Sequence, residues 1–173
     1  HDGILVLDKK ASPGDWLADI YKLNDTIIDI ENKMFTHRPD CFGILGVARE
    51  IAGIQQKGFK SPQWYLSELD TWDLERGLLP LEVSNKATKL VPRFMAVVMR
   101  DVTVGKSPIM IQSFLSRVGI KPINNIVDIT NFTMVLTGQP MHAYDYDKVH
   151  ALSKKSASIV VRSAKRGETV KVL

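Results

Sequence analysis

The sequence has little cysteine and no long apolar run, and each absence excludes a class of protein. Among its 173 residues Cys41 is the one cysteine, so no disulfide can form within the chain and a reducing compartment is expected. No stretch approaches the roughly 18 consecutive apolar residues that a membrane-spanning helix requires. No signal peptide opens the chain. We therefore expect a cytoplasmic protein that has no membrane partner.

Motifs for nucleotide hydrolysis are missing as well. The sequence contains neither a glycine-rich phosphate-binding loop nor a dinucleotide-binding fingerprint. Its net charge of +4 is compatible with a polyanionic partner, but the basic residues are scattered in pairs such as Lys154–Lys155 and Lys165–Arg166. Charge alone is therefore weak evidence for nucleic-acid binding. The 45% hydrophobic and 24% charged content is ordinary for a globular protein with a normal core.

The order of the expected elements predicts an α+β fold. We expect a mixed or antiparallel sheet around two central helices, incomplete at the C-terminus. The first of these helices starts at Ser107 and Pro108 and ends at Gly119, and the second runs from about Asn125 to Thr137 and ends at Gly138. A further helix is expected over 41–54, with Asp40 as its N-cap. Expected strands lie at 26–31, 81–84, 94–104, 158–162 and 169–173, the last two joined by a turn, and residues 3–7 are expected to form a short buried strand or loop.

Residues 58–80 carry glycines and prolines with the aromatic residues Trp64, Tyr65 and Trp72 between them, a composition typical of a linker. We place the domain boundary there and predict two domains, an N-terminal connecting region over 1–75 and a partial domain over 76–173. The chain opens without methionine and stops in a strand-like alternation, so we expect a piece of a longer protein.

The expected helix over 125–137 combines apolar residues on all sides with polar ones at helical spacing. A helix that is apolar all round is buried. Asp128 and Asn131 nevertheless share one side, and Thr130 and Thr133 share another. Buried polar groups need partners or line a polar cavity. Both outcomes stay open, since such residues commonly bond to nearby backbone.

The chain reverses after this helix. Pro140 stiffens the return, and a short reversal would bring His142 beside Thr130 or Asn131. A hydroxyl, a carboxamide and an imidazole together can bind an ester and order a water molecule. The alternative is a core histidine that donates to a backbone carbonyl.

Two other groups of side chains give weaker evidence for a functional site, one for a metal site and one for a cysteine nucleophile. His142, Asp145 and Asp147 match no standard zinc spacing, and Asp147 is expected to cap the following turn. His37 and Cys41 lie four positions apart, which suits a cysteine nucleophile, but Cys41 falls in the first turn of an apolar helix. We therefore expect a buried structural thiol and no metal site.

Two separated stretches carry long motifs. Residues 37–50 begin His-Arg-Pro-Asp-Cys and end Ala-Arg-Glu. Residues 119–131 contain Asn-Ile-Val-Asp-Ile-Thr-Asn, and residues 138–145 read Gly-Gln-Pro-Met-His-Ala-Tyr-Asp. The first stretch resembles a segment of the bacterial phenylalanine–tRNA synthetase beta subunit, and the other two resemble the editing-domain signature of that subunit. Residues 91–94 also resemble a strand of the family.

The resemblance implies an aminoacyl-tRNA synthetase subunit of an α2β2 heterotetramer, with tRNA(Phe) and the synthetase alpha subunit as partners. It implies an editing domain that hydrolyses tyrosine wrongly esterified to this tRNA, because a pocket for one side chain cannot fully reject a close analogue. ATP and Mg²⁺ are expected for the full enzyme, and no cofactor is expected in this segment. The alternative is a non-catalytic tRNA-binding or scaffolding segment of the same subunit.

The resemblance also assigns site residues. Thr130 and His142 match the catalytic threonine and histidine of the family, and Asn131 matches its substrate-binding asparagine. These residues would bind the aminoacyl-adenosine end and position the hydrolytic water. The glycine-rich loop of the family and its glutamate for the tyrosine hydroxyl are expected after Leu173. His37 and Val91 depart from the usual asparagine and cysteine of the family, outside the proposed site.

Overall fold

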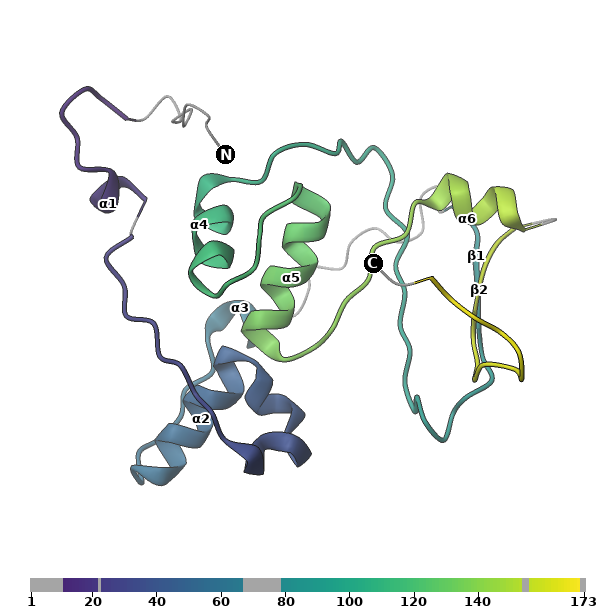
Figure 1. Cartoon of the computed structure of the whole chain (residues 1–173), viewed down its shortest axis with the longest axis horizontal. Helices are drawn as coiled ribbons and strands as arrows, with labels where there is room; N and C mark the ends of the chain where they lie inside the picture. The colour runs from purple at the N-terminus through teal and green to yellow at the C-terminus, as the bar shows by residue number, and fades with distance from the viewer. Residues whose placement is uncertain (1–10, 22, 67–78, 154–155, 172–173) are drawn as a thin grey trace. The chain divides into compact units, whose positions relative to one another are not determined.

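The computed structural model describes residues 11–21, 23–66, 79–153 and 156–171 (Figure 1). The fold is α+β, as the sequence predicts. The chain forms two compact units, and each is built from two separate stretches of sequence. Unit 1 comprises His1–Leu66 with Val104–Ala143, and unit 2 comprises Ser67–Thr103 with Tyr144–Leu173. The division into 1–75 and 76–173 stays a prediction.

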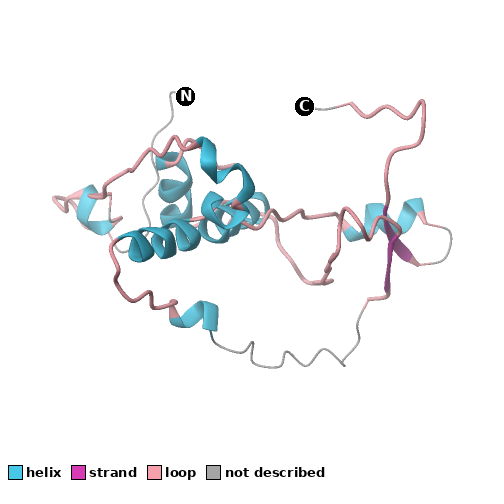
Figure 2. Ribbon diagram, turned by 90° about the horizontal axis from the view of Figure 1, so that it is seen from below, coloured by secondary structure: helices cyan, strands magenta, loops and turns pink. Residues whose placement is uncertain are grey.

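Unit 1 is helical in its described part (Figure 2). Helix α5 packs against α4 along its side and against α2 near its C-terminal end (Figure 1). Leu115 on α4 is fully buried. Phe114 on α4 and Phe132 on α5 pack edge to face, with 4.8 Å between their ring centroids. The elements are α1 (Leu17–Ile20), η1 (Lys33–His37), η2 (Pro39–Phe42), α2 (Ile44–Ile54), α3 (Gln63–Leu66), α4 (Ile109–Arg117) and α5 (Asn125–Thr137).

Helix α5 has the predicted bounds because both of its ends are capped. The side-chain oxygen of Asn124 accepts from the N–H groups of Ile126 and Val127, at 3.1 and 3.0 Å. Gly138 adopts φ 76°, the left-handed conformation that ends a helix. The prediction that α5 is buried was wrong: its residues are mostly half-buried, and Ile129 is 48% exposed.

The starts of α2 and α4 differ from the sequence predictions. Helix α2 begins at Ile44 with Gly43 as its N-cap, because the Asp40 side chain binds Arg38 and is not available as a cap. Pro108, without a side-chain hydrogen bond, is the N-cap of α4. The hydroxyl of Ser107, expected to cap this helix, donates to Asp128 instead.

Unit 2 contains a two-stranded sheet, shown in magenta in Figure 2. Strands β1 (Leu81–Asn85) and β2 (Ala157–Val161) run parallel, with Leu81 opposite Ala157 and Asn85 opposite Val161. Helix α6 (Tyr146–Leu152) precedes β2 and packs against it. The sequence located both strands within a residue. It did not predict their parallel pairing, because β2 was expected to form a hairpin with 169–173.

Several expected strands did not form. Residues 26–31 and 94–104 form no strand in the described chain. Alternation of apolar and polar residues produces a strand-like face, but a strand also needs the edge of a neighbouring strand to pair with. Residues 169–171 likewise form no strand. The strand or loop expected at 3–7 and the end of the strand expected at 169–173 lie outside the described residues, as does most of the expected linker.

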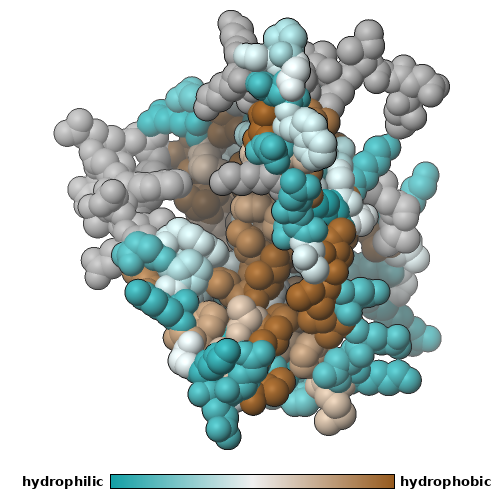
Figure 3. All heavy atoms as spheres, turned by 90° about the vertical axis from the view of Figure 1, so that its left-hand side faces the viewer, coloured by the Kyte–Doolittle hydropathy of each residue, from teal (hydrophilic) through white to brown (hydrophobic). Residues whose placement is uncertain are grey.

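The hydrophobic core of the described residues is small. Its buried apolar side chains are Tyr21, Cys41, Leu115 and Ala157. Large apolar side chains stay exposed in both units. On the one face that Figure 3 presents, hydrophobic residues, drawn in brown, gather in a stripe. In the part of the chain that the structure describes, no helix combines the length and apolar character needed to cross a membrane.

Candidate functional site

Among the described residues, the most deeply buried carboxylate belongs to α5 and joins the first turn of this helix to two loops. Asp128 is 1% exposed. Its carboxylate accepts the hydroxyl of Ser107 and the N–H of Ile123, the latter at 2.8 Å. A buried carboxylate without such partners would be strongly destabilising. Asp128 therefore fixes the segment before α4 and the segment before α5 to the same helix.

A second set of hydrogen bonds strengthens this junction. The N–H of Asn125 donates to the carbonyl of Gly105 at 2.9 Å, and the Asn125 side-chain oxygen accepts from the Gly105 N–H at 2.9 Å. Gln112 on α4 donates its amide to the carbonyl of Ser107. The start of α5 is thus held rigidly against α4 and its leading loop.

The predicted site residues Thr130 and Asn131 follow directly along this fixed helix. Both are half-buried. The Thr130 hydroxyl donates to the carbonyl of Val127 at 2.7 Å. Its proton is therefore turned back onto the helix, and its oxygen keeps the capacity to accept a hydrogen bond.

The third predicted site residue, His142, lies exposed in the irregular segment that follows Gly138. The structure places it in the same unit as Thr130 and Asn131. The meeting of the three side chains around one substrate stays a prediction. Asp145, and not Asp147, caps the next helix, since its carboxylate accepts from the Lys148 N–H at 3.2 Å.

The C-terminal end of α5 is held by the segment that carries the first motif. A Cβ atom built on Gly43 would lie within 3.0 Å of the Gly138 nitrogen and of the carbonyl carbon of Thr137. One built on Gly138 would lie 2.7 Å from the Pro39 carbonyl oxygen. The two stretches that resemble one family therefore touch each other, backbone against backbone, at the point where the chain leaves α5 toward His142.

Arg38 gives this segment its shape. Its guanidinium donates to both carboxylate oxygens of Asp40, at 3.0 and 2.9 Å, and to Glu50 on α2 at 3.0 Å. Such fork-like pairing is geometrically specific. The hydrogen bond from Arg38 also lowers the pKa of Asp40. Cys41 is buried, as predicted, and burial raises the pKa of its thiol.

The structural roles of Asp128 and Arg38 were not predicted from the sequence. A charged residue at an otherwise apolar helix position was the available signal for Asp128. For Arg38 the signal was its spacing from Asp40 and Glu50 across a predicted helix start. Among the described residues, no group of three or more histidine, cysteine, aspartate or glutamate side chains is placed to hold a metal ion.

Comparison with known proteins now identifies the class of this chain. Residues 90–173 match the B3/4 domain. That match covers α4 and α5 with the predicted site residues, as well as α6 and β2, and it defines the chain as the carrier of a B3/4 domain.

Three relatives extend the match to the remaining residues. The chain is 38% identical over 169 residues to the phenylalanine–tRNA ligase beta subunit of Desulfotalea psychrophila, covering 98% of the chain and 19% of that protein. It is 39% identical over 173 residues to that of Moorella thermoacetica, covering 100% and 20%. It is 37% identical over 172 residues to that of a Bacillus cereus strain, covering 99% and 20%.

The chain belongs to the phenylalanine–tRNA ligase beta subunit family. It spans about a fifth of the length of the curated relatives it matches.

Proposed function

We propose that this chain forms part of the editing domain of a phenylalanyl-tRNA synthetase, and that this domain hydrolyses the aminoacyl ester of mischarged Tyr-tRNA(Phe). The observation that carries the proposal is the fixed frame of α5. One end is held by Asp128 and the other by the contact of Gly138 with Gly43. Thr130 and Asn131 lie between these anchors, and His142 follows the second one.

The nucleophile in this proposal is a water molecule. The Thr130 oxygen and the Asn131 carboxamide hold the aminoacyl-adenosine end, and the exposed His142 imidazole orients the water toward the ester carbonyl. Positioning of this kind lowers the barrier because reactants held at attack distance need not find each other in solution. The tyrosine specificity would come from the glutamate of the family, expected beyond Leu173.

The whole enzyme is proposed to act in the cytoplasm as a heterotetramer with the synthetase alpha subunit. ATP and Mg²⁺ would serve its aminoacylation site. The non-catalytic alternative gives this segment only tRNA binding or scaffolding.

The test uses the complete synthetase that contains this chain, with Thr130→Ala and His142→Ala variants. Deacylation of Tyr-tRNA(Phe) should slow by about 10²-fold or more, the size typical of a lost positioning or acid–base group, while charging with phenylalanine stays unchanged. The matched control is Thr133→Ala, a half-buried threonine on the same helix. Deacylation that is unaffected by both changes, or absent from the wild type, would leave the scaffolding role.

A further inference from the structure

The parallel pairing in unit 2 brings two loops together that the sequence keeps apart. In a parallel pair the carboxyl ends of both strands lie at the same end of the sheet. The loop after β1 and the loop after β2 therefore start side by side, at Asn85 and Val161 (Figure 1). The N–H of Lys86 donates to the Val161 carbonyl at 2.8 Å, which extends the pairing into the first loop.

The loop after β1 is built around the side chain of Asn85. Its amide donates to the Val91 carbonyl at 2.7 Å, and its oxygen accepts from the Ala87 N–H at 3.0 Å. These two bonds hold both ends of the loop. Lys86 and Lys89 are exposed on this ordered backbone.

The loop after β2 is built around a carboxylate. Glu168 accepts two hydrogen bonds of 2.7 Å from the Arg162 guanidinium and a third, also 2.7 Å, from the N–H of Lys165. The Arg162 hydrogen bonds lower the pKa of Glu168 to about 2, so the carboxylate that holds this loop is ionised at neutral pH. Arg162 is thereby neutralised, and the exposed Lys165 and Arg166 occupy the turn between the two partners.

Positive charge is concentrated at this end of the sheet. Residues 86–93 contain three basic residues and no acidic one, and residues 162–171 contain four basic residues and one acidic one, Glu168. The excess in these two loops exceeds the net charge of +4 of the whole chain. The pairing of the strands thus brings the basic pair Lys165–Arg166 to the same end of the sheet as Lys86 and Lys89.

We propose that these two loops, 86–93 and 162–168, form a binding surface for the phosphate backbone of RNA. Lysine and arginine side chains on a fixed backbone neutralise successive phosphates and release their counterions. Because both loops are ordered by their own hydrogen bonds, little conformational entropy is lost on binding. The inference rests on the proposed function only for the identity of the RNA, which is tRNA(Phe).

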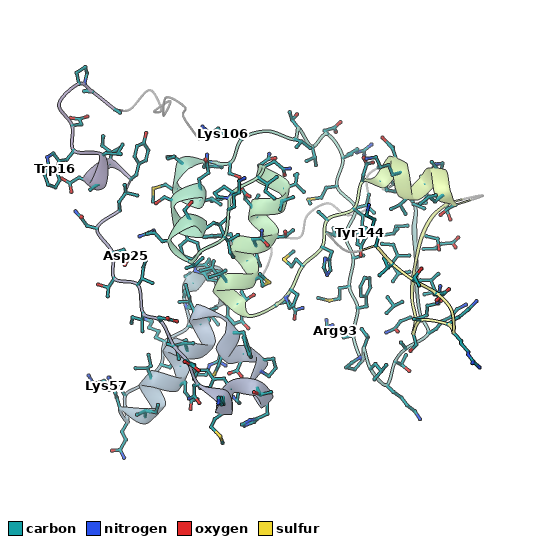
Figure 4. The ribbon with its side chains drawn as sticks, in the orientation of Figure 1. Trp16, Asp25, Lys57, Arg93, Lys106 and Tyr144 are labelled. Carbon is teal, nitrogen blue, oxygen red and sulfur yellow. The ribbon has the colours of Figure 1, made fainter. Side chains whose placement is uncertain are left out.

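The test measures binding of a tRNA(Phe) transcript to the complete synthetase across a series of salt concentrations. The variants Lys86→Ala/Lys89→Ala and Lys165→Ala/Arg166→Ala each remove two charges from one loop. The matched control is Lys57→Ala/Lys60→Ala, two exposed lysines of unit 1 that have the same spacing as Lys86 and Lys89 (Lys57 is labelled in Figure 4).

Each loop variant should weaken binding several-fold at low salt and reduce the slope of log K against log salt by about 1.5 to 2, since each lost phosphate contact removes roughly one unit. The control should keep the wild-type affinity and slope. Loop variants that bind with wild-type affinity and slope would overturn the proposal. A control variant that loses as much tRNA affinity as the loop variants would also overturn the proposal, because the loss would then come from the lower net charge alone.

A second readout separates this proposal from the proposed function. In Tyr-tRNA(Phe) deacylation the loop variants should raise KM and leave kcat unchanged, because the loops hold the RNA and do not touch the ester. A wild-type enzyme that binds tRNA with the predicted salt dependence but does not deacylate it would refute the editing function and leave the RNA surface standing. Loss of kcat with unchanged binding would refute the surface instead.

Discussion

At the scale of single residues, the contact between Gly43 and Gly138 joins the two motif-bearing stretches. The neighbours of a Cβ atom at Gly43 would be backbone atoms, which cannot swing aside as the end of a flexible side chain can. Glycine is therefore required at position 43 by close approach. The same holds for Gly46, where a Cβ atom would press against the Asp40 backbone.

Replacing Gly43 with alanine should push α2 away from the end of α5. We expect the complete subunit to lose about 1–3 kcal/mol of stability, the usual cost of overpacking, as measured by urea unfolding of the variant and the wild type. Gly53→Ala is the matched control, since it lies on α2 and an added Cβ there meets nothing within 4 Å. Equal stability of the two variants would mean that the close approach does not constrain the fold.

At the scale of elements, helix caps decided how much of the fold could be predicted. Helix α5 was located because Asn124 and Gly138 are local signals, readable within a few positions. The start of α2 was misplaced because Arg38, two residues away, binds the Asp40 side chain, and Arg38 also binds Glu50 on α2. A residue type that suits a cap is visible in a sequence, but which of two possible partners its side chain binds is not.

The same distinction applies to the strands and to the candidate site. Strands β1 and β2 were found from their composition, but their partner was not, since pairing joins residues more than seventy positions apart. Thr130, Asn131 and His142 came from resemblance to a family. Their helix was predicted correctly, whereas the buried anchor Asp128 was recognised only once Ser107 was seen against it.

Removing the anchor at the start of α5 should loosen the segment before it. Asp128→Ala leaves the Ile123 N–H and the Ser107 hydroxyl without their acceptor, at a cost of roughly 1–3 kcal/mol. Amide hydrogen exchange at Ile123 should then speed up. Asp128→Asn, which keeps one carbonyl oxygen, should retain more of the protection. Unchanged exchange at Ile123 in the alanine variant would contradict this role.

At the scale of the whole molecule, the described chain leaves much apolar surface uncovered. Four apolar residues are buried there, while side chains such as Ile54, Leu90 and Met95 are at least 74% exposed. Surfaces of this kind mark contacts with other protein. The chain spans about a fifth of the length of its relatives, and we expect these side chains to be covered by the remaining sequence in a subunit of that length.

Expressed alone, residues 1–173 should bind the apolar dye ANS and unfold over a broad temperature range. The complete subunit should bind less dye per residue and melt more sharply, because its other segments bury the same side chains. Fluorescence titration and calorimetry of the two proteins side by side provide the measurement. A sharp melt without dye binding for the isolated chain would show that it is self-sufficient.

The parallel partnership of β1 and β2 also has a consequence for synthesis on the ribosome. Everything from Lys86 to Ser156, including α4 and α5, is translated after β1 and before β2. The edge of β1 therefore stays unpaired while the second stretch of unit 1 is synthesised. Pairing of β1 with β2 must then close the long segment between them, which is slow. Until Ala157–Val161 leaves the exit tunnel, the unpaired edge of β1 can pair with strands of other chains. We therefore expect chaperones that shield unpaired strands to bind the nascent chain at this stage.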